Sequence, residues 1–221
     1  MKTLEGVIFD MDGVLIDSHP VHRIAWRRFL ASVGKNVPDK QLNFILEGRR
    51  REEILRYFLG DLPEGTIAEY GQRKEDFFQE NFKDIKLIPG VETFLVELQN
   101  AGIKIGIATS ASSYRTRRTL QLLNLENKFS TVITGDDVPA GKPDPSVYKL
   151  AAGRMNLKPE QLLVLEDAPC GVEAAKAAGI RCIGVTTNGR AESLRRAGAV
   201  YVIPDFMGLS IEKMLQLAQT N

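Results

Sequence analysis

Short apolar runs alternate with longer amphipathic stretches from about residue 86 onward, and this alternation constrains the fold more than any other feature. The apolar runs predict strands at Ile103–Ala108, Thr131–Thr134, Leu162–Leu165, Ile180–Val185 and Val200–Ile203. Helical patterns fall between them, as at Val147–Met155 and Val172–Ala178. Strands that alternate with helices form parallel sheets covered by helices on both faces. The sequence therefore predicts an α/β fold with a parallel-sheet core.

Residues 19–85 follow a different pattern, because apolar side chains recur there only at helical spacing. Val21, Ala25 and Phe29 are four residues apart, and no strand pattern intervenes before Lys86. We therefore predict a core of residues 1–17 and 86–221. An α-helical cap of residues 18–85 is inserted after the first strand.

Composition and charge exclude several classes of protein. The net charge is +1, from 29 basic and 28 acidic residues, which argues against a general nucleic-acid surface. Two cysteines are too few for a disulfide framework or a thiolate metal site. The chain begins with a strand-like stretch, Leu4–Phe9, and has no apolar run of membrane-spanning length. We expect a cytoplasmic protein without nucleic-acid or membrane partners, either a monomer or a weak homodimer.

Polar side chains follow the carboxyl ends of the predicted strands, where parallel sheets bind ligands. These positions carry Asp10 and Asp12, then Thr109 with Ser110, then Lys142, and then Glu166 with Asp167. Clustered carboxylates suit Mg²⁺, which commonly binds one or two of them together with a substrate phosphate. A lysine, a hydroxyl and backbone N–H groups hold phosphate oxygens. This set is what phosphoryl transfer requires, because its catalysis is mainly positioning and charge neutralisation.

Four motifs occur in the order and with the spacing typical of the haloacid dehalogenase superfamily, and the chain resembles its members over nearly its whole length. The motifs are Asp10-Met11-Asp12-Gly13-Val14, Thr109-Ser110, Lys142-Pro143-Asp144-Pro145 and Glu166-Asp167. The position of the helical insert resembles the subgroup that includes β-phosphoglucomutase and many sugar-phosphate phosphatases. The resemblance implies a Rossmann-like core with a helical cap, and a small phosphorylated metabolite as the substrate.

The resemblance also implies roles for the motif residues. Asp10 resembles the nucleophile that forms an aspartyl-phosphate, and Asp12 the general acid/base. Thr109 and Lys142 resemble the groups that hold the transferred phosphate. The implied Mg²⁺ ligands are Asp10, Asp12, Glu166 and Asp167, with Glu166 acting directly or through water. Haloacid dehalogenases lack an acid at the Asp12 position, so its presence favours phosphate-ester chemistry.

A second set of residues is expected to bind the rest of the substrate: His22, Gly48, Arg51, Lys74, Ser110 and Ala111. Arg51 aligns with an arginine that grips a non-transferring phosphate in similar caps, whereas Arg49 and Arg50 are interpreted as a solvated helix start. Lys74 lies along an apolar helix face, where an inward lysine needs an anionic partner. The alternatives are that Lys74 reaches out to water and that His22 is a packed histidine.

The best function on this basis is a phosphatase that acts on a small, sugar-like phosphomonoester. The alternative is a β-phosphoglucomutase-type mutase. Those enzymes carry a lysine and an asparagine where this chain has Ser112 and Ser113, and Arg115 is the candidate to compensate. A second alternative, from another class, is a catalytically silent sugar-phosphate sensor, although no motif residue is missing.

Overall fold

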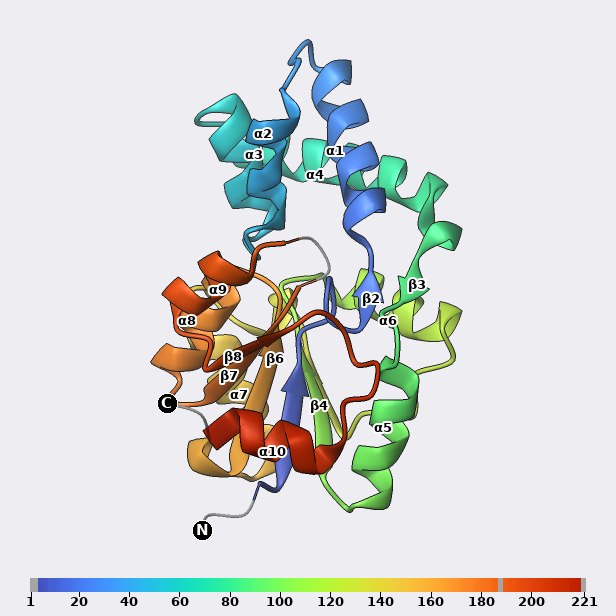
Figure 1. Cartoon of the computed structure of the whole chain (residues 1–221). Helices are drawn as coiled ribbons and strands as arrows, with labels where there is room; N and C mark the ends of the chain where they lie inside the picture. The colour runs from blue at the N-terminus through green and yellow to red at the C-terminus, as the bar shows by residue number, and fades with distance from the viewer. Residues whose placement is uncertain (1–3, 187–188, 220–221) are drawn as a thin grey trace.

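A six-stranded parallel sheet forms the centre of the computed structural model, which describes residues 4–186 and 189–219 (Figure 1). Its strand order is β5-β4-β1-β6-β7-β8. The bounds in that order are Thr131–Ile133, Lys104–Ala108, Gly6–Phe9, Leu162–Glu166, Arg181–Val185 and Tyr201–Ile203. Along the chain, β4 and β5 are added on one side of β1, and β6, β7 and β8 are added on the other. The strand order therefore reverses at β1, and ligands usually bind at the carboxyl ends of the strands next to such a reversal. The predicted α/β fold is confirmed.

Helices cover both faces of this sheet. One face carries α5 (Val91–Asn100) and α10 (Ile211–Gln219), and the other carries α7 (Ser146–Met155), α8 (Pro169–Ala177) and α9 (Ala191–Ala197). Strand β1 is buried on both sides, because Val7 and Phe9 pack into one apolar cluster and Ile8 packs into the other. This alternation follows from the two-residue period of a strand, and it fixes which residues leave β1 toward the site.

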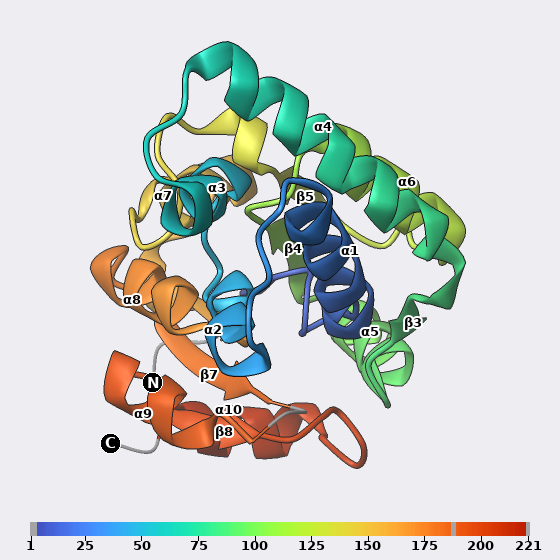
Figure 2. The ribbon, with the colours of Figure 1, turned by 90° about the horizontal axis from the view of Figure 1, so that it is seen from above.

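The inserted segment is helical, as predicted, and lies beyond the carboxyl ends of the strands (Figures 1 and 2). Its helices are α1 (His19–Ser32), α2 (Asp39–Leu42), α3 (Arg51–Leu59) and α4 (Glu64–Glu80). Trp26, Phe29 and Leu55 belong to a third apolar cluster, whose residues all come from the inserted segment. This separate cluster supports our proposal that residues 18–85 form a cap domain.

A two-stranded antiparallel ribbon joins the cap to the core, and the sequence did not predict it. It pairs β2 (Ile16–Asp17) with β3 (Lys86–Leu87). Strands of two residues are too short to carry an alternating pattern. The ribbon brings the exit from the core and the return to it side by side.

Two expectations concerned membranes and cysteines. None of the helices in the described residues is long and apolar enough to cross a membrane. Cys170 and Cys182 are buried free thiols. Burial raises the pKa of Cys170 to about 11 and that of Cys182 well above its usual range, so neither is a reactive thiolate.

Candidate active site

A cavity of about 230 Å³ lies between the strand ends and the cap. Ten of the predicted site residues line it: Asp10, Asp12, Thr109, Ser110, Ala111 and Asp167 from the core, and His22, Gly48, Arg51 and Lys74 from the cap. Lys142 and Glu166 are the predicted residues that do not. The fold therefore brings residues that are far apart in sequence to one polar pocket.

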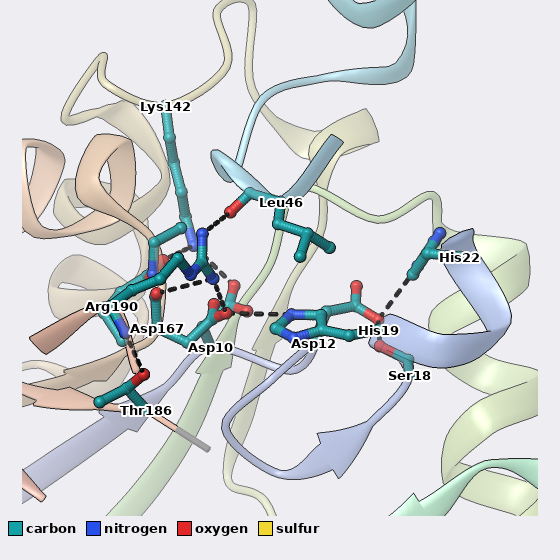
Figure 3. A network of polar contacts seen from close by, with 12 residues as sticks. Asp10, Asp12, Ser18, His19, His22, Leu46, Lys142, Asp167, Thr186 and Arg190 are labelled. Atoms are coloured by element: carbon teal, nitrogen blue, oxygen red, sulfur yellow. Dashed lines mark hydrogen bonds and ion pairs between the residues drawn. The ribbon is translucent and has the colours of Figure 1, made fainter. Parts of the chain in front are cut away.

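Lys142 lies directly behind the cavity and joins two buried acids. Its Nζ atom is 2.6 Å from Asp10 Oδ1 and 2.6 Å from Glu166 Oε1 (Figure 3 shows the Asp10 side). Burial alone would lower the pKa of Lys142, but Asp10 and Glu166 raise it above its ordinary value. The lysine is therefore a fixed positive charge beside Asp10.

Glu166 uses both of its oxygens inside the core. Oε1 also accepts a hydrogen bond from the Tyr148 hydroxyl at 3.1 Å, and Oε2 accepts one from the Ala168 N–H at 2.8 Å. A Cβ atom at Gly171 would lie 1.7 Å from Oε1, so glycine is required there. These contacts favour Glu166 as the residue that orients Lys142, whereas its predicted place at a metal stays a prediction.

Thr109 directly follows β4, lines the cavity and is buried. Its N–H donates to the Ile133 carbonyl at 3.0 Å, and its Oγ1 accepts from the Ala111 N–H at 3.1 Å. Both bonds fix the threonine while leaving its hydroxyl hydrogen available as a donor.

Asp12 forms a two-pronged ion pair with Arg115 of α6 (Ser113–Leu122). Arg115 Nη1 is 2.8 Å from Asp12 Oδ1, and Nη2 is 2.6 Å from Oδ2. Ser18 Oγ also donates to Oδ1 at 2.5 Å. Burial alone would raise the pKa of Asp12, but Arg115 and His22 hold it well below its usual range. Asp12 is therefore a carboxylate in this arrangement.

His22 links Asp12 to Lys74 of the cap. Its Nε2 is 3.4 Å from Asp12 Oδ1, and its Nδ1 is 3.3 Å from Lys74 Nζ. Burial and the Lys74 charge lower the pKa of His22 to about 3, so the ring is neutral. A neutral ring with its hydrogen on Nε2 satisfies both contacts, since it donates to Asp12 and accepts from Lys74. His22 is thus part of the site as well as packed against Phe78.

Asp167 is held by two side chains, Arg190 and His19, that the sequence analysis missed. Arg190 Nη2 lies 2.9 Å from Asp167 Oδ2, and His19 Nε2 lies 3.0 Å from the same oxygen (Figure 3). A Cβ atom at Gly13 would fall 2.3 Å from this oxygen, which explains the glycine of the first motif. Arg190 follows β7, so the rule that located the other site residues, extended to that strand, would have pointed to it.

The cap loop before α3 is bonded to several core loops. Ser110 Oγ donates to the Gly48 carbonyl at 2.9 Å, and Arg190 Nη1 donates to the Leu46 carbonyl at 2.5 Å. Arg50 Nη2 donates to the core carbonyls of Gly135 at 2.7 Å and Val138 at 2.5 Å. Our interpretation of Arg50 as solvated was wrong, because these carbonyls give its guanidinium partners that water would otherwise supply.

Arg51 opens α3 and lines the cavity from the cap side. Its nearest partners are distant, since Nη1 is 3.4 Å from the Gly71 carbonyl and Nη2 is 3.7 Å from Glu52. Its Nε atom is buried without a hydrogen-bond partner. Arg51 is therefore poorly neutralised by the protein, as a group that meets an anionic ligand would be.

Carboxylate side chains at the cavity are candidate ligands for a divalent cation. Among residues 4–186 and 189–219, no three His, Cys, Asp or Glu side chains converge as a ready metal cluster. Asp10 and Asp167 nevertheless both line the cavity. Each uses one carboxylate oxygen for a cation, and no described residue donates a hydrogen bond to the other. Hard oxygen donors of this kind fit Mg²⁺.

Comparison with known proteins decides the family. Residues 7–185 match the haloacid dehalogenase-like hydrolases. The chain belongs to this family. The resemblance inferred from the four motifs is thereby confirmed, and the protein is an enzyme of the hydrolase or phosphotransferase class.

Individual members of the family are similar over most of their length. A phosphorylated carbohydrates phosphatase from Thermotoga maritima is 36% identical over 214 residues, with 90% of this chain and 94% of the relative covered. A β-phosphoglucomutase from Bacillus subtilis is 30% identical, with 82% and 83% covered. The crystal structure of a β-phosphoglucomutase from Clostridium difficile superposes with a TM-score of 0.87 at 25% identity, with 98% and 97% covered. These similarities place the haloacid dehalogenase-like chain in the β-phosphoglucomutase-like subgroup.

Proposed function

We propose that this haloacid dehalogenase-like hydrolase is a Mg²⁺-dependent phosphatase that acts on a small phosphorylated carbohydrate through an aspartyl-phosphate on Asp10. The arrangement of Asp10 supports this most directly. One oxygen is held by the charged Lys142, no described residue donates a hydrogen bond to the other, and the residue lines the cavity. A carboxylate fixed in this way is oriented for attack on phosphorus.

In the first step, Asp10 attacks the substrate phosphorus and the bond to the sugar oxygen breaks. Lys142 balances the negative charge that gathers on the phosphoryl oxygens, and the Thr109 hydroxyl donates to one of them. The departing oxygen needs a proton, and Asp12 lies at the same cavity to supply it. Because Arg115 and His22 favour the carboxylate form of Asp12, the protonated acid has to form when substrate is bound.

In the second step, water takes the phosphoryl group from Asp10. Asp12 accepts the proton from water as the new bond to phosphorus forms. The carboxylate form that the protein favours suits this step without further change. Release of inorganic phosphate restores Asp10 beside Lys142.

Mg²⁺ would be held by Asp10 and Asp167, with the backbone carbonyl of Asp12 as a further candidate donor. When bound, it would supply positive charge next to the transferring phosphate. Arg190 and His19 hold Oδ2 of Asp167, and such partners fix the orientation of a metal-binding carboxylate.

The cap residues support a carbohydrate with a distal anionic or hydroxyl group. Arg51 and Lys74 line the cap side of the cavity. Relatives from Thermotoga maritima and Escherichia coli are described as a phosphorylated carbohydrates phosphatase and a hexitol phosphatase, the latter 34% identical over 181 residues. Binding energy from the cap can therefore select the sugar while the core carries out a common reaction.

A hexose-phosphate mutase is the second candidate, because β-phosphoglucomutases are among the relatives. The positions where a mutase would grip its second phosphate have structural tasks here. Ser112 Oγ accepts from the Arg115 N–H at the start of α6, and Ser113 Oγ hydrogen-bonds Thr134 Oγ1 at 2.8 Å. Arg115 is paired with Asp12, so it does not replace the missing phosphate contacts. These contacts favour hydrolysis over transfer.

The proposal includes a cytoplasmic location and a monomer or weak homodimer. Two buried free thiols are compatible with a reducing compartment.

A screen of phosphorylated sugars and sugar alcohols with Mg²⁺ tests the proposal. Phosphate release from some of them, reversible loss of activity with a chelator, and inhibition by beryllium fluoride with Mg²⁺ are the expected results. Full activity in excess chelator would contradict the metal-dependent mechanism. Binding of sugar phosphates without phosphate release would favour a silent sensor.

A further inference from the structure

Arg115 belongs to the core but also contacts the cap, and neither proposed step gives it a task of its own. Its side chain is 9% exposed, and both terminal nitrogens bond Asp12. Nη1 is also 3.3 Å from His22 Nε2, and the guanidinium carbon is 5.4 Å from the centre of the Phe78 ring. A charge this well buried and paired is expensive to place, so its position calls for an explanation.

The partners of Asp12 divide between the two parts of the molecule. Ser18 and His22 lie on the cap side of the ribbon, at 2.5 Å and 3.4 Å from Asp12 Oδ1. Arg115 is the described core side chain that bonds Asp12. A cap movement would carry Ser18 and His22 away from Asp12, whereas α6 and the end of β1 would stay together.

The start of α6 is itself fixed to the sheet. Ser113 Oγ bonds Thr134 Oγ1 at 2.8 Å, and the Ser113 N–H donates to Asp136 Oδ2 at 2.8 Å. Both partners follow β5 (Thr131–Ile133). Arg115 therefore projects from a rigid part of the core, two residues beyond this anchor.

We propose that Arg115 is a positioning residue that keeps Asp12 ready to activate water, whether the cap is open or closed. The proposal rests on the aspartyl-phosphate mechanism above. In the step concerned, a water oxygen bonds to phosphorus while the bond from phosphorus to the Asp10 oxygen breaks. The electron pair of that bond returns to Asp10, and the water proton passes to Asp12. Inorganic phosphate leaves, and Asp12 later releases its proton to solvent.

This role determines which acceptor takes the phosphoryl group. A mutase has to protect its phosphorylated aspartate from water while one sugar phosphate leaves and returns in another orientation. A core-held Asp12 gives no such protection, because it can activate water during that interval. Arg115 therefore commits the chain to hydrolysis.

Acetyl phosphate provides the test, because its leaving group, acetate, needs no proton from Asp12. Phosphorylation of Asp10 then does not depend on Asp12, and the decay of the aspartyl-phosphate can be followed separately. Wild type, Arg115→Met, Arg115→Lys and Arg117→Met are phosphorylated in the presence of Mg²⁺. The decay of the phosphorylated protein is then followed by intact mass after acetyl phosphate is removed. Arg117 is the matched control, since it is exposed on the same helix.

We expect the phosphorylated Arg115→Met protein to decay at least about tenfold more slowly than wild type, because a misplaced general base loses part of the roughly hundredfold or more that it contributes. Arg115→Lys should be intermediate, because an ammonium group holds Asp12 without the two-pronged geometry. Arg117→Met should match wild type. If Arg115→Met does not fold, the lysine variant carries the test, and its decay should still be slower than that of wild type.

Equal decay in wild type and in the folded Arg115 variants would overturn the role of Arg115 and leave the proposed function standing. Wild type that releases no phosphate from acetyl phosphate in the presence of Mg²⁺ would overturn both.

Discussion

The core side and the cap side of the cavity differ in how closely their cationic side chains are paired with acids. On the core side, three cations each meet an acid at hydrogen-bond distance: Lys142 meets Asp10 and Glu166, Arg115 meets Asp12, and Arg190 meets Asp167. On the cap side, Arg51 has only distant partners, at 3.4 Å and 3.7 Å. No carboxylate of the described chain lies within ion-pair distance of Lys74.

This difference assigns different tasks to the two sides. A cation matched by an acid needs no ligand, so the core pairs hold reactive groups in fixed positions before substrate arrives. A buried cation without a close acid, such as Lys74, is costly until an anion reaches it, and the half-exposed Arg51 has only Glu52 at 3.7 Å. We therefore propose that the cap side recognises the charge of the substrate. Substitutions on the two sides should fail in different ways.

The largest effect is expected at the nucleophile. Asp10→Asn should lower phosphate release by at least about a thousandfold, because an amide oxygen is a poor nucleophile. Circular dichroism should show an intact fold. Asp84→Asn, which changes an exposed acid away from the cavity, is the control and should keep most activity. Appreciable turnover by Asp10→Asn would remove the covalent step from the core side.

Lys142→Met should damage stability as well as activity. It leaves Asp10 and Glu166 buried without their shared cation, a change that costs about 3–5 kcal/mol in comparable buried pairs. Chemical denaturation should report this loss. Lys149→Met, on the exposed side of α7, is the matched control and should change stability little. A stable Lys142→Met protein would mean that the core charges are not mutually dependent.

Arg51→Ala and Lys74→Ala should impair substrate selection instead. Losing a charged contact should reduce kcat/KM for the natural sugar phosphate by about 10- to 100-fold. Hydrolysis of a small aryl phosphate should change far less, because it does not reach the cap. Arg56→Ala on the same helix as Arg51 serves as the control, since Arg56 bonds Glu64 away from the cavity. Equal losses on both substrates would give these residues a structural or chemical role.

The pH dependence of KM should show a smaller effect, again on substrate recognition by the cap. Burial lowers the pKa of Lys74 to about 7, so its positive charge is lost in the folded protein as the pH rises through that value. Between about pH 6 and about pH 8 the charged fraction falls about tenfold. KM for a substrate with a second anionic group should therefore rise more steeply in wild type than in Lys74→Met. Parallel pH profiles of KM for the two proteins would exclude Lys74 as the recognition charge.

Much of the core side was predictable because periodicity and motif spacing act over short distances. All five predicted strands form, with ends that differ by at most one residue. Asp10, Thr109 and Asp167 reach one cavity because the carboxyl ends of parallel strands meet at one edge.

The cross-domain contacts were not predictable in the same way. Arg50, Arg115 and Arg190 each bond groups far away in the sequence, and no local pattern encodes such a partner. The β2–β3 ribbon was missed because two-residue strands have no period. Glu166 is the last residue of β6, yet its side chain is bonded inside the core, where Lys142, Tyr148 and the Ala168 N–H donate to its two oxygens.

Competition between water and sugar for the phosphoryl group tests the account most directly. The protein is given β-glucose 1-phosphate with a catalytic amount of glucose 1,6-bisphosphate and Mg²⁺, and both inorganic phosphate and glucose 6-phosphate are followed in one sample. A core that holds Asp12 through Arg115, with serines at positions 112 and 113, should release phosphate faster than it forms glucose 6-phosphate. Glucose 6-phosphate that accumulates without phosphate release would contradict the account and make the protein a mutase.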